Sequence, residues 1–228
     1  MTQPRIFADP AAAVADIPDG ATIMIGGFGG VGVPHALIRA LNERALNNLT
    51  IIANGTGARL GRPSSVEARM VAKAIVSFPI SPSPRPDDPF EQGYESGTIA
   101  LEIVPQGTLA ERIRAAGAGI PAFYTPTGVG TPFAEGKELR EIDGRPYVLE
   151  RALGADFALI RAFRADAMGN LVYRNAARNF NPMMATAARV TIAEVAEVVE
   201  AGTLDPEGIV TPGIFVDRVV VVGGGDGR

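Results

Sequence analysis

The sequence of 228 residues is 46% hydrophobic, enough to bury a full core as one large domain or two small ones. The formal net charge is −4 and no lysine- or arginine-rich run occurs, which argues against a nucleic-acid partner or an anionic membrane surface. The chain has no cysteine and one histidine, His35, so disulfides and cysteine–zinc sites are excluded and no metal site is expected.

Short β-rich runs alternate with alanine-rich helical stretches, which is typical of an α/β sheet layered by helices. A strand at 22–25 is expected to lead into the glycine-rich stretch of residues 26–32. Pro34 suits the first turn of the next helix, because its missing N–H would be unpaired there in any case. The other elements expected before residue 80 are a helix at 10–15, a helix with Leu37, Ile38 and Leu41 as its buried stripe, a strand within 47–55, a helix at 65–73 and a strand at 74–78.

Residues 79–89 hold five prolines, which sustain neither a helix nor a central strand, so an extended surface loop is expected. Further on, we expect a hairpin around Asp143-Gly144 and a helix that begins near Pro182 with Asn181 as its cap. The other expected elements are a helix at 109–116 and strands at 99–104, 157–162, 171–173, 190–195 and 219–222. We expect one domain over residues 1–222, followed by a flexible glycine-rich tail at 223–228.

The sequence gives no sign of a membrane segment. No apolar run reaches the roughly 20 residues that a membrane helix needs. The opening MTQPRIFADP lacks the charged-then-apolar form of a signal peptide. Because the absence of cysteine also fits that compartment, a cytoplasmic location is expected.

The glycine-rich stretch allows more than one interpretation. Gly27, Gly29 and Gly32 satisfy the pattern G-x-G-x-x-G, but a dinucleotide site also needs an acidic residue about 20 positions later, at the end of the next strand. That strand ends at Asn54 with no Asp or Glu beside it. A nucleotide-binding module therefore stays an alternative. So does a tight strand-to-helix turn whose glycines serve only to allow positive φ.

The side chains around these glycines carry a more specific signal. The motif GGF, followed after three residues by Gly32 and then Pro34, and preceded by a DG turn and a β run, resembles the signature of the A subunits of family I CoA-transferases. The segment VPQGTLAERIRAAGAGIPAFYTPTGVGT (104–131) is similar to the most characteristic block of that family. The later segments EGKELREIDGRPYVLE, ADFALIRA, GNLVYRNAARNFNP and TPGIFVDRVV match it in order. The resemblance covers nearly the whole chain and implies a three-layer fold, with an open, mostly parallel sheet and helices on both faces.

The resemblance also implies that this chain is half of an enzyme. In the family, a glutamate attacks the acyl-CoA thioester, and CoA then passes onto that glutamate as a thioester before a second acid receives it. The family carries the glutamate on a separate B subunit, in a Ser-Glu-Asn-Gly motif that is absent here. The chain is therefore expected to be inactive without the B subunit, with which it would form a hetero-oligomer, A1B1 or A2B2. No cofactor is implied, because the CoA thioester is a substrate.

By resemblance, Gln106 occupies the position of the family's oxyanion-hole glutamine, whose amide N–H₂ is a donor. The alternative is that Gln106 only ties down the loop before the helix. Asn54 matches the first asparagine of the family's frequent S-N-N-A-G segment, and the resemblance implies that it binds the substrate or CoA; Gly55 replaces the second asparagine, so one amide is lost.

The close-approach loop of the family corresponds here to Gly26, Gly27, Phe28 and Gly29, which would lie against the substrate or against the partner's catalytic segment. Phe28 has the alternative of being a core residue.

The substrate expectation rests on similarity as well. The segment SFP (77–79) and the run from TPTGVGT through EGKELREIDGRPYVLE look most like the 3-oxoadipate transferases. They imply CoA transfer from succinyl-CoA to 3-oxoadipate, with acetoacetate or another short-chain 3-oxoacid as the alternative. A dicarboxylate needs a cation at its distal end, for which Arg59, Arg62 and Arg85 are the candidates.

Overall fold

The computed structural model describes residues 4–56, 66–80 and 87–222 of the chain. Eight strands form the main sheet, and every pair of neighbours in it is parallel. These strands are β1 (Arg5–Phe7), β2 (Thr22–Ile25), β3 (Leu49–Gly55), β4 (Val71–Phe78), β5 (Ala100–Ile103), β9 (Ala155–Arg161), β12 (Ala188–Val195) and β14 (Arg218–Val221). Their order across the sheet is β1-β14-β12-β9-β2-β3-β4-β5.

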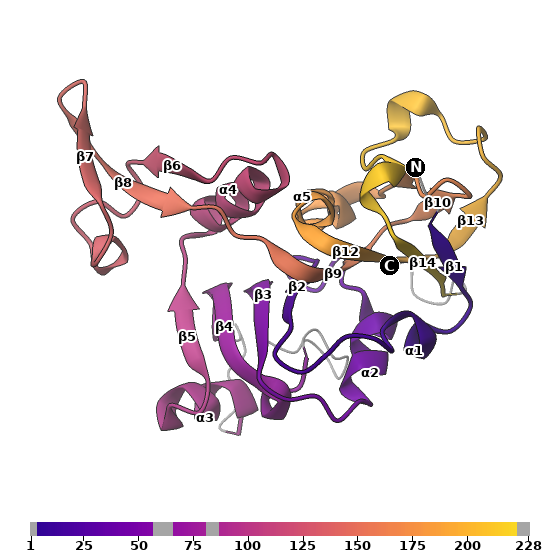
Figure 1. Cartoon of the computed structure of the whole chain (residues 1–228), viewed down its shortest axis with the longest axis horizontal. Coiled ribbons are helices and arrows are strands. Elements are labelled where there is room, and N and C mark those ends of the chain that lie inside the picture. Colours follow the sequence, from indigo (N-terminus) through magenta and orange to yellow (C-terminus); the bar gives the residue numbers. More distant parts are fainter. Residues whose placement is uncertain (1–3, 57–65, 81–86, 223–228) are drawn as a thin grey trace.

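Helices cover both faces of this sheet, which confirms the expected three-layer α/β fold (Figure 1). Successive side chains of a strand point to opposite faces. Accordingly Ile23 and Ile25 of β2 join one hydrophobic cluster, and Met24 between them joins the other. The helices are α1 (Pro10–Ala13), α2 (His35–Asn42), α3 (Pro89–Ser96), α4 (Gln106–Gly117) and α5 (Asn181–Thr186).

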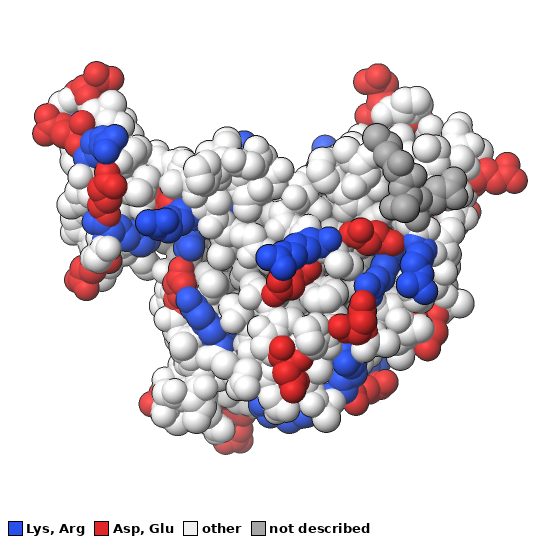
Figure 2. Space-filling view, in the orientation of Figure 1, with Lys and Arg blue, Asp and Glu red and all other residues white. Residues whose placement is uncertain are grey.

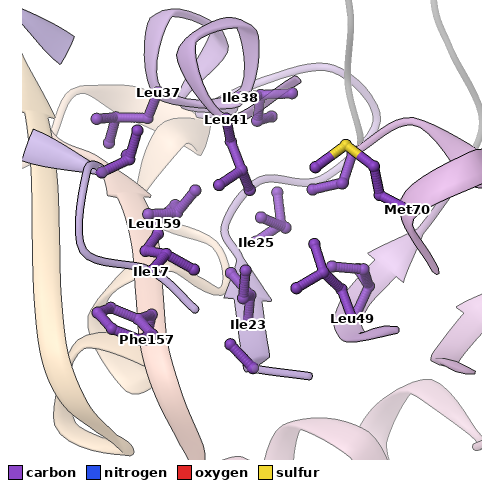
Figure 3. Packing of buried hydrophobic residues seen from close by; sticks show 14 of the residues in the cluster. Ile17, Ile23, Ile25, Leu37, Ile38, Leu41, Leu49, Met70, Phe157 and Leu159 are labelled. Carbon is purple, nitrogen blue, oxygen red and sulfur yellow. The ribbon is translucent and has the colours of Figure 1, made fainter. Parts of the chain in front are cut away.

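The cluster beneath α2 shows why this helix forms where the sequence predicted it. Leu37, Ile38 and Leu41 are fully buried, as the predicted stripe requires, and they pack over Ile25 and Leu159 (Figure 3). The opposite cluster takes its helical residues from α4 and α5.

Two small sheets flank the main one. β6 (Ala122–Thr125), β8 (Arg145–Arg151) and β7 (Leu139–Ile142) form an antiparallel sheet in the order β6-β8-β7. It extends away from the body as an arm along which acidic and basic side chains are interspersed (Figures 1 and 2). β11 (Leu171–Val172), β10 (Arg164–Asp166) and β13 (Glu197–Val199) form the other. The predicted hairpin is confirmed, since Asp143 and Gly144 have the positive φ values, 51° and 73°, that a type I′ turn needs.

Short 3-10 turns complete the described structure. They are η1 (Ala68–Met70), η2 (Pro132–Ala134), η3 (Asn175–Arg178), η4 (Pro206–Gly208) and η5 (Gly213–Phe215).

The prediction of a helix at 65–73 is wrong. In the described part of this range, from Val66 on, the helical structure is limited to the 3-10 turn Ala68–Met70, and Val71 already begins β4. Residues 71–78 pair with β3 on one side and β5 on the other, and β-branched Val71, Ile75 and Val76 fit a buried strand. Sheet pairing therefore overrides the helical propensity of the alanines and Lys73.

Two other boundaries differ from expectation. The proline-rich loop gives way at Pro89 to α3, for which Asp88 is the N-cap that binds the amide of Phe90. Residues 81–86 of that loop and the predicted tail at 223–228 lie outside the described residues. The helix expected from residue 109 begins at Gln106, which places this glutamine in its first turn.

A charged cluster ties edge strand β5 to α4. Glu102 contacts Arg112 Nη1 at 2.8 Å and Lys73 Nζ at 2.7 Å. Partial burial raises the pKa of Glu102, but the hydrogen bonds and charges of Arg112 and Lys73 outweigh it and hold this pKa below its usual value. Because the pKa of Glu102 is lower in the folded state, its ion pairs stabilise the fold fully above the unfolded pKa. This stabilisation is lost as the pH falls through the folded pKa.

Replacing Glu102 with glutamine is therefore expected to lower the free energy of unfolding near pH 7 by about 0.5–1 kcal/mol, since solvent screening keeps such a pair weak. The difference should shrink as the pH falls through the folded pKa of Glu102 and vanish once the parent carboxylate is protonated in the folded state as well. Urea unfolding at several pH values measures this. Glu111→Gln, whose carboxylate pairs with Arg114 on the exposed surface of α4, is the matched control and should show a smaller difference. A constant deficit of Glu102→Gln at every pH would contradict the prediction.

Candidate active site

The predicted site residues lie at the carboxyl ends of the strands of the parallel sheet. β3, β4 and β5 follow one another on one side of β2, whereas β9, β12 and β14 lie on the other side. Ligands of open parallel sheets bind at the carboxyl ends of the strands where the order changes direction, here between β2 and β9. The glycine-rich stretch follows β2 directly, so it occupies this position.

The first part of that stretch is a tight turn. Phe28 and Val31 exchange two backbone hydrogen bonds of 3.0 and 2.9 Å around Gly29 and Gly30, which have φ values of 56° and 85°. This turn exposes both apolar side chains, 47% of Phe28 and 44% of Val31. The alternative that Phe28 is a core residue is therefore wrong. We call residues 28–31 the glycine turn.

Gly26 and Gly27, which precede the glycine turn, are buried, and both need to be glycine. A Cβ on Gly26 would lie 1.9 Å from Oδ1 of Asn181. Gly27 has a φ of 114°, which other residues rarely adopt, and a Cβ there would meet Val33. Close packing thus explains these two glycines without a ligand.

The prediction that Asn181 is the N-cap of α5 is wrong, because Phe180 holds that position. Its fully buried side chain instead connects three segments. Nδ2 donates to the carbonyl oxygens of Gly32 (3.0 Å) and Ala177 (2.8 Å), and Oδ1 accepts from the backbone N–H of Arg161 (3.0 Å). Asn181 therefore joins the glycine-rich stretch to the end of β9.

Gln106 and Asn54 are brought together, although 52 positions separate them in sequence. Gln106 Nε2 donates to Asn54 Oδ1 at 2.5 Å, and Asn54 is buried at the end of β3. The second N–H of this amide has no partner among the described residues. Asn54 thus restrains the glutamine side chain, and within the described ranges one amide donor stays available.

Gly55, where the family often has a second asparagine, is enclosed by the neighbouring strand. A Cβ at this position would lie 2.8 Å from the carbonyl oxygen of Phe78. A second amide side chain therefore does not fit the present backbone beside Asn54.

A buried carboxylate occupies the N-terminus of α2. Glu194 of β12 is 1% exposed, and its Oε2 accepts from the backbone amides of Ala36 (2.8 Å) and Leu37 (3.2 Å). Arg161 Nη1 lies 3.2 Å from its Oε1. Burial raises the pKa of Glu194, and the charge of Arg161 and the two amides counteract this.

Glu194 argues against the nucleotide-binding alternative. Dinucleotide folds bind the pyrophosphate with the free amides and positive dipole of the helix that follows the first strand. Here a carboxylate of the chain itself takes two of these amides, and the N–H of His35 is bonded to the carbonyl oxygen of Val33. Sequence reasoning missed Glu194; the available signal was one acidic residue near the end of the apolar strand VTIAEV (190–195).

Elsewhere in the described residues we find no stronger candidate for the active site. Two surface hollows, of about 220 and 410 Å³, lie at the opposite, amino ends of the strands, lined by residues such as Asn48 and Thr98, and Thr22 and Gly154. In the described ranges no cluster of three or more His, Asp or Glu is placed to hold a metal ion. Nor does any helix in those ranges have the length and apolar character to cross a membrane. The predicted cations Arg59, Arg62 and Arg85 lie outside the described residues.

Comparison with known proteins agrees with the resemblance seen in the sequence. A family model described as "Coenzyme A transferase" matches residues 7–222. The chain is 56% identical over 223 residues to the A subunit of 3-oxoadipate CoA-transferase from Pseudomonas putida, covering 96% of this chain and 94% of that protein. It is 52% identical over 217 residues to the A subunit of succinyl-CoA:3-ketoacid coenzyme A transferase from Xanthomonas campestris pv. campestris (strain B100), covering 94% and 88%.

A solved structure shares the fold. The acyl-CoA transferase YdiF of E. coli O157:H7, in a thioester complex with CoA, superposes with a TM-score of 0.82 at 26% identity. The match covers 96% of this chain and 47% of YdiF, so the chain spans about half the length of that protein.

Proposed function

The chain belongs to the coenzyme A transferase family, and from this premise we propose that it is the A subunit of an enzyme that transfers CoA from succinyl-CoA to a 3-oxoacid. The observation that carries this proposal is identity above 50%, over nearly the full length, to two proteins named as the A subunits of such enzymes. The hydrogen bond between Gln106 and Asn54 at the carboxyl edge of the sheet agrees with it.

The proposed reaction proceeds on a glutamate of the B subunit. Its carboxylate attacks the thioester carbonyl of succinyl-CoA, which expels CoA thiolate and forms a mixed anhydride. The thiolate then attacks the glutamyl carbonyl, which releases succinate and leaves CoA on the glutamate as a thioester. The 3-oxoacid reverses these two steps and departs as its CoA ester. No cofactor takes part, because CoA is transferred between substrates.

This chain's contribution is electrostatic stabilisation. Each attack places negative charge on a carbonyl oxygen, and a positioned donor stabilises that charge most in the transition state. We assign this role to the second N–H of the Gln106 amide. The bond to Asn54 restrains the amide before substrate binds. A neutral amide also keeps its donor at any pH at which the protein is folded.

The glycine turn is proposed to face the substrate or the catalytic segment of the B subunit. It lies at the switch between β2 and β9 and presents exposed Phe28 and Val31. Gly29 allows the turn its positive φ of 56°, and buried Gly26 and Gly27 pack the segment that leads into it.

The buried carboxylates of the described residues support a nucleophile on another chain. Glu150 is bonded to Lys137 Nζ at 2.5 Å, Glu194 pairs with Arg161, and Asp166 accepts from the backbone amides of Met168 and Asn170. A nucleophile must approach the thioester carbonyl, whereas these three carboxylates are buried and held by partners inside the fold.

For the acceptor we propose 3-oxoadipate. Two 3-oxoadipate CoA-transferase A subunits, from Pseudomonas putida and Acinetobacter baylyi, are 56% and 54% identical to this chain. The succinyl-CoA:3-ketoacid A subunits of Xanthomonas campestris and Bacillus subtilis are 52% and 46% identical. Acetoacetate is the competing acceptor, and the ratio of kcat/KM for the two acids with the assembled enzyme distinguishes them.

A complementation assay tests the function. The chain alone should form no 3-oxoadipyl-CoA from succinyl-CoA, and adding the B subunit should start turnover. Hydroxylamine trapping during turnover should modify a glutamate of the B subunit, leaving every acidic residue of this chain unmodified. Turnover by the isolated chain, or trapping on it, would refute the proposal.

We also propose that the two subunits form a heteromer, A1B1 or A2B2, in the cytoplasm. The names of the relatives as A subunits support the heteromer, and the absence of cysteine from the sequence supports the compartment. The mass of the assembled complex in light scattering distinguishes the two stoichiometries.

A further inference from the structure

Two buried side chains hold the backbone where the glycine-rich stretch enters α2. Asn181 donates to the carbonyl oxygen of Gly32, and Glu194 accepts from the amides of Ala36 and Leu37. Arg161 connects the two, because its N–H donates to Asn181 and its guanidinium pairs with Glu194. We call Glu194, Arg161 and Asn181 the anchoring cluster.

The helix needs an anchor of this kind because it has no local cap. A helix usually satisfies its first amides with the side chain of its N-cap residue, most often Ser, Thr, Asp or Asn. The N-cap of α2 is Pro34, which makes no such bond. Glu194 supplies the acceptor from 158 positions away in sequence, so capping the helix also attaches it to β12.

A buried carboxylate is a costly way to cap a helix. Removing a charge from water is unfavourable unless an opposite charge and hydrogen bonds compensate, and here Arg161, two amides and the helix dipole do so. Arg39 of α2 adds a favourable charge from farther away. Beyond stability, this arrangement fixes the position of the start of α2, since it links that helix to β9, β12 and α5.

We propose that Glu194 is a positioning residue for the transfer reaction, a role that rests on the proposed function. It fixes the start of α2 and, through Arg161 and Asn181, the end of the glycine-rich stretch. The glycine turn is thereby kept at the one location where it can meet the substrate or the catalytic segment of the B subunit. Displacing a positioning element by about 1 Å can cost up to 10²-fold in rate without any change in the reacting groups.

Three variants of the full chain test this proposal. Glu194→Ala removes the acceptor, whereas Glu194→Gln keeps one side-chain oxygen for the amides and is the milder variant should alanine impair folding. Val195→Ala is the matched control, because Val195 is fully buried in the same strand and belongs to the hydrophobic cluster on the opposite face of the sheet.

Hydrogen exchange and kinetics give separate readouts. In Glu194→Ala the amides of Ala36 and Leu37 should exchange at least about tenfold faster, because their acceptor is gone. In the enzyme assembled with the B subunit, kcat should fall by about 10- to 10²-fold while KM for succinyl-CoA stays within about threefold. Glu194→Gln should recover part of both losses. Val195→Ala should lower the Tm yet keep kcat within about twofold of the parent value.

Each contrary result has a distinct meaning. Unchanged exchange at Ala36 and Leu37 would show that Glu194 does not hold the helix, and faster exchange with unchanged kcat would show that the reaction does not need it held. An equal fall of kcat in Val195→Ala would reduce the role of Glu194 to stability. Any of these overturns the proposal. If the parent chain, assembled with the B subunit, transferred no CoA, the proposed function would fall, and hydrogen exchange would still decide whether Glu194 anchors the loop.

Discussion

Gln106→Ala, assembled with the B subunit, is expected to lose about 10²–10³-fold in kcat, the usual cost of removing one oxyanion-hole donor. The amide should bind the developing oxyanion more strongly than the ground-state carbonyl, so KM for succinyl-CoA should change little. Steady-state kinetics in both directions of transfer measures this effect. Since each half-reaction builds a similar oxyanion, the loss should be comparable in the two directions.

The matched control is Gln92→Ala. Gln92 is an exposed glutamine on α3, away from the carboxyl edge of the sheet, and its loss should leave kcat unchanged. Unfolding curves of both variants separate a catalytic loss from a folding defect. An unchanged kcat in Gln106→Ala would reject the oxyanion role and leave the alternative, that Gln106 only ties its loop to Asn54.

The features that could be predicted from sequence are those with a local cause. The strand at 22–25 was predicted to the residue, because a β-branched apolar run ends there at consecutive glycines. The buried stripe of α2 follows helical spacing, and the Asp143-Gly144 turn follows from the positive φ that the pair readily adopts. By contrast, the helix expected at 65–73 failed because pairing with strands β3 and β5, from elsewhere in the sequence, decides the conformation from Val71 onward.

The same distinction between local and long-range causes applies to the candidate site. Gln106, Asn54 and the glycines were singled out by their motifs, but the bond between Gln106 and Asn54 depends on how β3 and β5 lie in the sheet. Local patterns predict the anchoring cluster even less, since Asn181 reaches Gly32 across 149 positions and Glu194 reaches Ala36 of α2 across 158. For Asn181 the local pattern gave a wrong prediction, because asparagine before a helical proline is a typical N-cap.

Gly26→Ala is expected to lower the free energy of unfolding by about 2–3 kcal/mol, near the upper end of the usual cost of overpacking. For a chain of this size that corresponds to a fall in Tm of roughly 5–10 °C. The added methyl would lie 1.9 Å from Asn181 Oδ1, a distance that forces one group to move. Asn181 cannot yield easily, because it is fully buried and hydrogen-bonded to Gly32, Ala177 and Arg161. Thermal and urea unfolding of the chain measure the loss.

Gly107→Ala controls for the change from glycine to alanine itself. No atom lies within 4 Å of its added Cβ, and Gly107 sits in the first turn of α4, so this substitution should be neutral or stabilising by up to about 1 kcal/mol.

A double-mutant cycle then identifies the cause of the loss in Gly26→Ala. Asn181→Ala removes the atoms that the new methyl meets, so the combined variant should be at least about 1 kcal/mol more stable than the sum of the two single losses predicts. Strict additivity would mean that strain elsewhere in the backbone, and not contact with Asn181, is what requires glycine at this position.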